Sequence, residues 1–204
     1  MPRNQPPEAP PTARRASTLT PEQWIEAATA LLVDGGVDLV RVDVLARQMG
    51  VTRGSFYWHF KDRDDLLQRM LQAWREAATE QVTQRFSGRH ADPEALIRDI
   101  ISLPFRGRAA QRAARIELAI RDWARRDPMA RQAVDEADAS RMSYIAQCFS
   151  ALGFGIVEAR HRAAVLYAYE VGESLLAQQG TAAQKADRCA LAVQLLLTPL
   201  KQTG

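Results

Sequence analysis

Hydrophobic residues recur every three to four positions along most of the chain after residue 19, and no segment shows the alternation of a β-strand. In the first such segment, one face carries Trp24, Ile25, Ala28, Leu31 and Leu32. Glycines and prolines separate the segments. The pattern predicts an all-α protein of about nine helices, which we expect near residues 21–34, 42–49, 52–60, 63–86, 93–102, 108–126, 128–151, 156–179 and 182–198.

Several of these helices have a recognisable start. A side chain that can accept a hydrogen bond precedes a proline, which suits the first helical position because its missing N–H would be unpaired there. This arrangement occurs at Thr20-Pro21, Asp92-Pro93 and Asp127-Pro128. Asp62, with Asp65 three positions later, is expected to cap the fourth helix.

The stretch GVTRGSFYWHFKDRDDLL, residues 50–67, concentrates aromatic rings in a short segment. The helix before it, a turn at Gly50-Val51 and the helix after the turn form a helix-turn-helix pattern. Phe56 and Phe60 are four positions apart and therefore share a helix face. We expect both rings in a small core with Leu45, Val51 and Leu66.

The remaining side chains of this stretch are hydrogen-bond donors that cannot all be buried beside the two phenylalanines. Arg53 has the geometry for guanine O6 and N7, and the aromatic donors suit phosphates. Gly54 is a poor helix former whose bare backbone allows another surface to approach. We therefore predict a DNA-contact surface made of Arg41, Thr52, Arg53, Gly54, Ser55, Tyr57, Trp58, His59 and Lys61.

Charge limits how this surface would bind DNA. The 204 residues carry a net charge of +3 with a pI of about 9.1, yet residues 1–70 contain nine Lys/Arg and nine Asp/Glu. A few well-placed groups, and not a broad positive field, would have to bind the nucleic acid. Residues 1–18 are rich in proline and arginine, so we expect a disordered basic arm in which Arg14 and Arg15 could reach DNA.

Other features predict a cytoplasmic protein. There is no signal peptide, and no apolar run approaches the ~20 residues of a membrane helix. Cys148 and Cys189 lack metal-type or redox-type spacing, although a disulfide between them stays conceivable. The three histidines are isolated, so we expect no metal site and no cofactor, and we find no catalytic constellation typical of an enzyme.

The stretch at 50–67, preceded by VDVLARQMG, resembles the N-terminal DNA-binding domain of the TetR family of transcriptional regulators over about residues 20–70. The resemblance implies a homodimer with a DNA-binding head, here residues 19–66, and a larger effector-binding and dimerisation domain, here residues 67–200. It implies a ligand-responsive regulator, and we expect repression at a palindromic operator relieved by a small molecule. The family usually has Thr at position 41; Arg41 can replace its phosphate contact but not its helix cap.

The larger domain carries most of the remaining aromatic residues, which can enclose an apolar pocket. The expected pocket residues are Trp74, Phe105, Trp123, Tyr144 and Tyr167. We expect neither a dominant cationic cluster nor a dominant anionic cluster at this pocket, so the sequence does not identify the ligand. Glu170 and Glu173 lie three positions apart on a helix and are expected at a solvated edge.

The last two helices are expected to form the dimer surface. Small and apolar residues follow helical stripes that permit close packing around a two-fold axis, namely Ala163, Ala164, Ala168, Gly172, Ala186, Ala190, Val193 and Leu197. An alternative function is a helical small-molecule binding protein with no DNA-binding role, which the neutral first seventy residues favour.

Overall fold

A computed structural model describes residues 19–87 and 92–199, and only the backbone of residues 80–87. Over these ranges the chain is all-α, as predicted. Its α-helices are α1 (Pro21–Gly35), α2 (Val42–Gln48), α3 (Arg53–Tyr57), α4 (Arg63–Ser87), α5 (Pro93–Ile101), α6 (Gly107–Ala124), α7 (Pro128–Ala151), α8 (Ile156–Leu175) and α9 (Ala182–Leu197). Two short 3₁₀ helices that were not predicted, η1 (Val37–Leu39) and η2 (Leu103–Phe105), precede α2 and α6. The arm with Arg14 and Arg15 lies outside the described residues.

The helix starts follow the predicted chemistry. Thr20 and Gln23 form a capping box at α1, and Asp92 and Asp127 accept backbone N–H groups at the starts of α5 and α7. Asp62 accepts the Asp65 amide at 2.9 Å, which caps α4. The Lys61 amide and then the Arg69 guanidinium lower the pKa of Asp65 from its usual value.

Two helices end earlier than predicted. The third was expected over 52–60, but α3 ends at Tyr57, and His59 and Phe60 continue only as turns onto the Phe56 carbonyl. The eighth was expected to reach residue 179, but α8 ends at Leu175. The loop that follows α8 contains Gly180, whose φ of +80° is in the left-handed region that favours glycine, and it leads to the Thr181 cap of α9.

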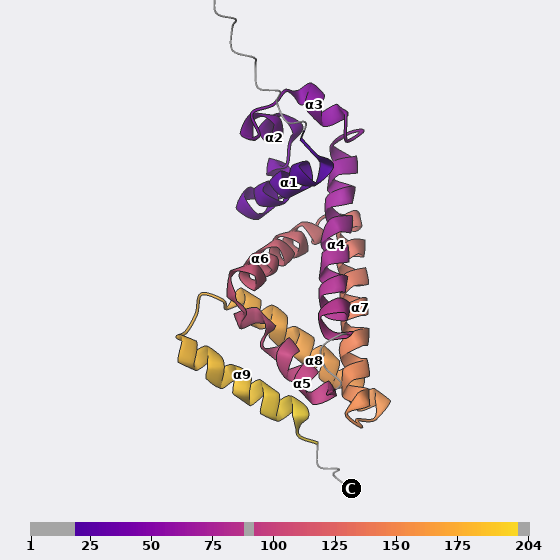
Figure 1. The fold of residues 1–204 in the computed structure, drawn as a ribbon, viewed down its shortest axis with the longest axis vertical. Coiled ribbons are helices and arrows are strands. Elements are labelled where there is room, and N and C mark those ends of the chain that lie inside the picture. Colours follow the sequence, from indigo (N-terminus) through magenta and orange to yellow (C-terminus); the bar gives the residue numbers. More distant parts are fainter. Residues whose placement is uncertain (1–18, 88–91, 200–204) are drawn as a thin grey trace, which may run out of the picture.

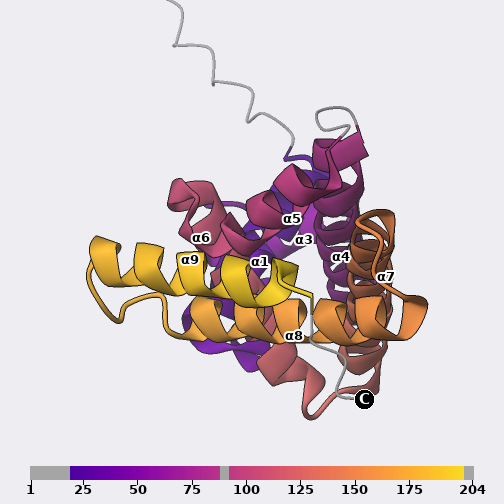
Figure 2. The ribbon, with the colours of Figure 1, turned by 90° about the horizontal axis from the view of Figure 1, so that it is seen from below.

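The helices are arranged along one long axis (Figure 1). The first three helices form one end, α4 and α7 run lengthwise, and α8 and α9 lie at the other end, where they run side by side in both views (Figures 1 and 2). No helix in the described part of the chain has the length and apolarity to cross a membrane.

Two hydrophobic cores fill the molecule, and α6 contributes to the core at the head. This first core combines residues of α1 to α4 with Ile120 and Trp123 of α6 and Val134 of α7. The second joins α5, α7, α8 and α9 around Ile97, Phe149 and Leu166. The head is therefore packed directly on α6 and α7 through shared apolar burial.

The turn between α2 and α3 depends on Gly50. The Val51 amide donates to the Ala46 carbonyl at 2.9 Å and the Gly50 amide to the Arg47 carbonyl at 3.2 Å, the two bonds of a Schellman motif. Gly50 has a φ of +67°, in the left-handed region that side chains other than glycine rarely adopt. The conformation of one glycine thus sets the direction in which α3 leaves α2.

We expect Gly50→Ala to lower the free energy of unfolding by about 1–2 kcal/mol, because a Cβ disfavours the left-handed conformation. No atom lies within 4 Å of the added Cβ, so the backbone alone accounts for the loss. Gly54→Ala is the matched control, since Gly54 is helical and the change should be neutral or stabilising by about 0.5–1 kcal/mol. Urea denaturation measures both, and equal stabilities of the two variants would contradict the expectation.

Candidate nucleic-acid interface and internal cavity

Phe56 and Phe60 hold α3 on the body of the protein. Both side chains are essentially inaccessible, at 0% and 1% exposed, and their rings stack with centroids 5.2 Å apart. Trp24 meets the edge of Phe56 at 5.4 Å. Leu45 and Leu66 are buried and Val51 is half-buried in the same core, as predicted. Burying this face of a five-residue helix leaves the opposite face to the solvent.

The opposite face carries the predicted DNA-contact side chains. Trp58 is 87% exposed and Tyr57 54% exposed, which is unusual for large rings. Among the others on this segment, Ser55 and His59 are half-buried, and the exposed ones are Thr52, Arg53, Gly54 and Lys61. One helix and the turn after it therefore bring eight of the nine predicted residues together at the end of the molecule (Figure 1).

Gly54 is not required by the packing of the protein itself. A Cβ at this position would meet only the Thr52 Oγ1 atom, at an ordinary contact distance of 3.6 Å. The backbone of the first turn of α3 is therefore uncovered toward the solvent. This is the geometry expected where a second surface must approach closely.

The ninth predicted residue, Arg41, lies just before α2. It occupies the cap position without a side-chain capping bond, as its chemistry requires, and its guanidinium pairs with Asp43 at 3.1 Å in an exposed position. An exposed pair of this kind is weak and can exchange for a phosphate. The role of the neighbouring Arg63 was not predicted. Its guanidinium donates to the Val40 and Val37 carbonyls at 2.7 and 2.8 Å and so fixes the entry to α2.

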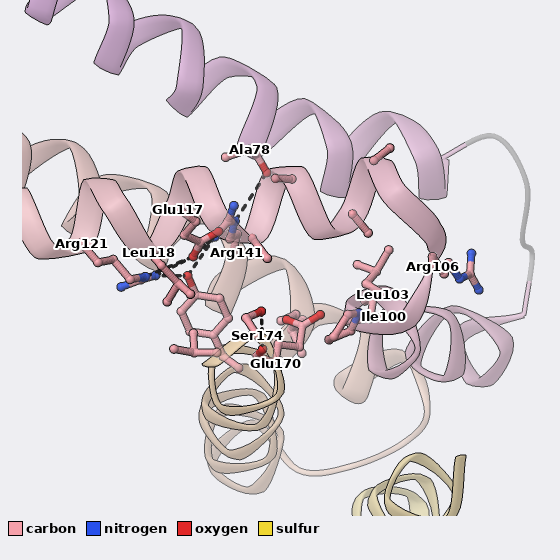
Figure 3. Close-up of a pocket in the computed structure, with 18 residues that line it drawn as sticks. Ala78, Ile100, Leu103, Arg106, Glu117, Leu118, Arg121, Arg141, Glu170 and Ser174 are labelled. Carbon is pink, nitrogen blue, oxygen red and sulfur yellow. Dashed lines mark hydrogen bonds and ion pairs between the residues drawn. The ribbon is translucent and has the colours of Figure 1, made fainter. Parts of the chain in front are cut away.

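A cavity of about 230 Å³ lies between α4, α5, η2, α6, α7 and α8 (Figure 3). Most of its wall is apolar, with a row of alanines from α6 opposite residues of α5 and α8. The lining residues are Ala78, Ile100, Leu103, Pro104, Arg106, Ala109, Ala110, Ala113, Ala114, Glu117, Leu118, Arg121, Arg141, Ile145, Tyr167, Glu170, Val171 and Ser174. An apolar concavity with a few polar groups is the usual form of a small-molecule site.

A charged network crosses one side of this cavity. Glu117 accepts from Arg121 and Arg141 at 2.9 Å, and Arg121 also pairs with Asp138 at 2.6 Å. The Tyr167 hydroxyl donates to Asp138 at 2.5 Å and accepts from both arginines, at 2.6 and 3.0 Å. The network contains two guanidinium groups and two carboxylates, so neither positive nor negative charge dominates it, but the network itself was not predicted. The charged residues come from α6 and α7 and the tyrosine from α8, and their spacing along the sequence does not reveal that they meet.

Glu170 lies in the cavity apart from this network (Figure 3). Burial raises the pKa of its carboxyl to about 8; the positive charge of Arg141 lowers it and the negative charge of Glu117 raises it, by less than burial does. At neutral pH the side chain is therefore mostly the uncharged acid. Glu170 was predicted at a solvated edge, and the structure corrects that prediction because this face of α8 is covered by α6 and α7.

Glu173 also departs from the predicted solvated edge. Its side chain is 5% exposed and forms two bonds with Arg188 of α9, at 2.6 and 2.7 Å. This ion pair with two hydrogen bonds joins α8 to α9. The two glutamates are three positions apart, yet one faces the cavity and the other faces α9, which a sequence pattern cannot distinguish.

Only one of the five predicted pocket residues, Tyr167, lines the cavity. Trp74 and Trp123 pack in the core at the head, and Tyr144 lies against the second core. Phe105 follows two lining residues of η2 but does not line the cavity itself. For Trp123 the reason is its phase on α6: it is two positions after Arg121 and so points to the opposite side.

The predicted dimer residues fall on two sides of α8 and α9. Exposed positions are occupied by Ala164, Ala168, Ala186 and Ala190, and Gly172 is half-buried. Ala163 is buried in the second core, so its prediction as a surface residue is corrected. Val193 and Leu197 are half-buried against the same core, so the second half of their stripe packs partly inside the subunit.

Comparison with known proteins shows that the first helices are similar to a described family. Residues 25–70 match "Bacterial regulatory proteins, tetR family". The regulator SrpR of Pseudomonas putida is 42% identical over 52 residues, which is 26% of this chain and 24% of that protein. The resemblance derived from the sequence is thereby confirmed. The chain spans only 23% to 39% of the length of the curated relatives it matches.

Solved structures extend the likeness from the head to the fold of the whole chain. A transcriptional regulator from Rhodococcus sp. Rha1 superposes with a TM-score of 0.70 and 20% identity, over 88% of this chain and 94% of that one. The fatty acid degradation regulator FadR of Bacillus subtilis, solved with stearoyl-CoA, has a TM-score of 0.64 and 17% identity over 89% and 100% of the two chains. At these identities the match concerns the fold.

The raised pKa of Glu170 should make stability depend on pH. In the unfolded chain this carboxyl ionises near pH 4.5, but in the folded protein only near pH 8, so the folded state holds an extra proton between these values. Its contribution to the free energy of unfolding is therefore complete below about pH 4.5 and is lost as the pH rises through 8. We expect Glu170→Gln to match the wild type at pH 5 and to exceed its stability by a few kcal/mol at pH 9.

Denaturation curves at both pH values measure the difference, with the exposed Glu76→Gln as the control for loss of a glutamate. A difference between wild type and Glu170→Gln that stays constant from pH 5 to 9 would show that this carboxyl ionises normally in the folded protein.

Proposed function

We propose that the chain is a ligand-responsive transcriptional regulator that represses by binding a palindromic DNA operator as a homodimer and leaves it when a small molecule binds. The observation that carries the proposal is the outward display of Arg53, Tyr57 and Trp58 from a helix anchored by buried phenylalanines. The match of residues 25–70 to the tetR family and the fold of the whole chain support it. We place the protein in the cytoplasm and assign it no cofactor, metal or enzymatic role.

The proposed DNA contacts are of two kinds, contacts to base edges and contacts to backbone phosphates. Arg53 lies at the start of α3, where the recognition helix of a helix-turn-helix meets base edges, and its guanidinium can pair with guanine in the major groove. Thr52 and Ser55 flank it as adaptable hydrogen-bonding groups. Tyr57, Trp58, His59 and Lys61 lie where donors to phosphates fix the register of the helix. Arg41 reaches the backbone after exchanging Asp43 for a phosphate.

The outer face of α8 and α9 supports dimerisation. Among the side chains that the structure describes, ten large hydrophobic ones are exposed. Seven of them lie on these helices or directly after α8, namely Ile156, Val157, Val165, Leu175, Leu176, Leu191 and Leu195. The other three are on the head. Exposed apolar residues gathered on two neighbouring helices are typical of an interface, and the exposed alanines of both helices permit close approach of a second copy. A two-fold axis through this face presents two heads to the half-sites of a palindrome.

The two faces of α6 connect the cavity to the head. Glu117 and Arg121 line the cavity, whereas Ile120 and Trp123 are buried in the head core. Arg112 of α6 also pairs with Glu26 of α1 at 3.0 Å. A ligand that prefers a shifted position of α6 therefore changes the orientation of the head, and it weakens DNA binding by its differential affinity for the two states.

The decisive measurement is fluorescence polarisation with DNA from upstream of the chain's own gene and with a selected-sequence library. We expect one sequence to be preferred, with affinity falling steeply as salt increases. Arg53→Ala should remove the preference, costing about 1–3 kcal/mol on the preferred sequence. Gly54→Ala should weaken binding without loss of stability. Ligand binding with no selected DNA sequence would instead support a helical small-molecule binding protein.

Leu195→Glu tests the dimer. Leu195 is 64% exposed, so the change should leave the subunit folded while placing a charge in the proposed interface. We expect a monomer in sedimentation velocity and loss of tight operator binding. The exposed Gln111→Glu on α6, which adds the same charge outside the proposed interface, is the control. A wild-type protein that sediments as a monomer at all concentrations would overturn the proposal.

A further inference from the structure

Among the described residues that line the cavity, every charged side chain but one has an ion-pair partner. Arg121 pairs with Asp138 and Glu117, Arg141 shares Glu117, and Arg106 pairs with Asp99. Three arginines are thus matched by three carboxylates. Glu170 is a fourth carboxylate, and no hydrogen bond or ion pair joins its side-chain oxygens to another residue of the described ranges.

The surroundings of Glu170 explain why it tolerates this position. Ile100, Ile145 and Val171 line the same cavity, and burial in such an apolar environment disfavours the ionised form of the carboxyl. The carboxyl therefore stays protonated in the empty cavity at neutral pH and avoids the cost of a buried, unpaired charge. The same group becomes a carboxylate as soon as a cation is placed beside it.

We propose that the cavity binds a lipophilic molecule carrying a basic nitrogen, and that the carboxylate of Glu170 pairs with this nitrogen. The inference rests on the proposed function, because it names the class of effector that the regulator would sense. The alanine-rich wall of α6 accepts the apolar part of such a molecule. An anionic ligand finds every lining arginine already paired and would have to break one of those pairs.

Proton release accompanies this mode of binding. Glu170 gives up its proton when the protonated amine arrives, so affinity should rise with pH until the carboxyl is ionised in the free protein as well. The other charged or titratable groups at the cavity are Glu117, Arg121 and Arg106 from α6 or its cap, Arg141 from α7 and Tyr167 from α8. Each of these already has a hydrogen-bonding or ion-pair partner.

Three probes with the same apolar body separate the charge of the ligand from its shape: 4-phenylbutylamine, 4-phenylbutanol and 4-phenylbutyrate. Isothermal titration at pH 7 should show the amine binding at least about tenfold more tightly than either of the others. The amine should bind about fiftyfold more tightly at pH 8 than at pH 6, because the ionised fraction of the carboxyl in the free protein rises by about that factor. Titrations in two buffers with different ionisation enthalpies should reveal proton release at pH 7.

Three variants test whether the Glu170 carboxyl causes the preference for the amine. Glu170→Gln should lower the affinity for the amine about tenfold and leave the alcohol unchanged, whereas the exposed Glu76→Gln should change neither. Ala113→Val narrows the cavity without altering its charge and should weaken the amine and the alcohol alike. Thermal denaturation of each variant confirms that it is folded.

The ligand class is overturned if the amine does not bind, if the butyrate binds as tightly as the amine, or if Glu170→Gln leaves the preference for the amine intact. Operator binding measured without any probe decides the proposed function separately. An amine that binds through Glu170 but leaves DNA affinity unchanged would uphold the ligand class and overturn its role as the effector.

Discussion

The burial of Phe56 and Phe60 is the constraint on which the proposed DNA-contact surface depends. A helix as short as α3 has few intrahelical hydrogen bonds and little stability alone, so tertiary packing must hold it in place. The two stacked rings and Trp24 provide that packing. Once they are buried, the intervening Tyr57 and Trp58 must turn outward, because neighbouring positions on a helix point in different directions.

The longer helices α6 and α8 also have two faces in different environments. One face of α6 belongs to the head core and the other to the cavity, and α8 presents Glu170 to the cavity while Val165 faces outward. A helix buried on both sides cannot move on one side without disturbing the other, because protein interiors are closely packed. The cavity, the head and the outer apolar face are therefore mechanically connected through single helices.

The sequence predicted the head more completely than the cavity, and the reason is the range of the interactions. The burial of Phe56 and Phe60, the turn at Gly50 and the caps of the helices rest on residues a few positions apart. The cavity instead depends on Arg121, Arg141 and Tyr167, which meet from three helices. Nothing local distinguishes Glu170 from an exposed glutamate, and Trp123 resembles a pocket residue until its face of α6 is known.

The exposure of Trp58 also has an optical consequence. Trp24, Trp74 and Trp123 all lie in the head core, whereas the indole of Trp58 is 87% exposed. Of the four tryptophans, it is therefore the one that a dissolved collisional quencher such as iodide reaches most freely. The chain thus contains a natural fluorophore at the tip of its head, whose emission can be separated from that of the core without attaching a dye.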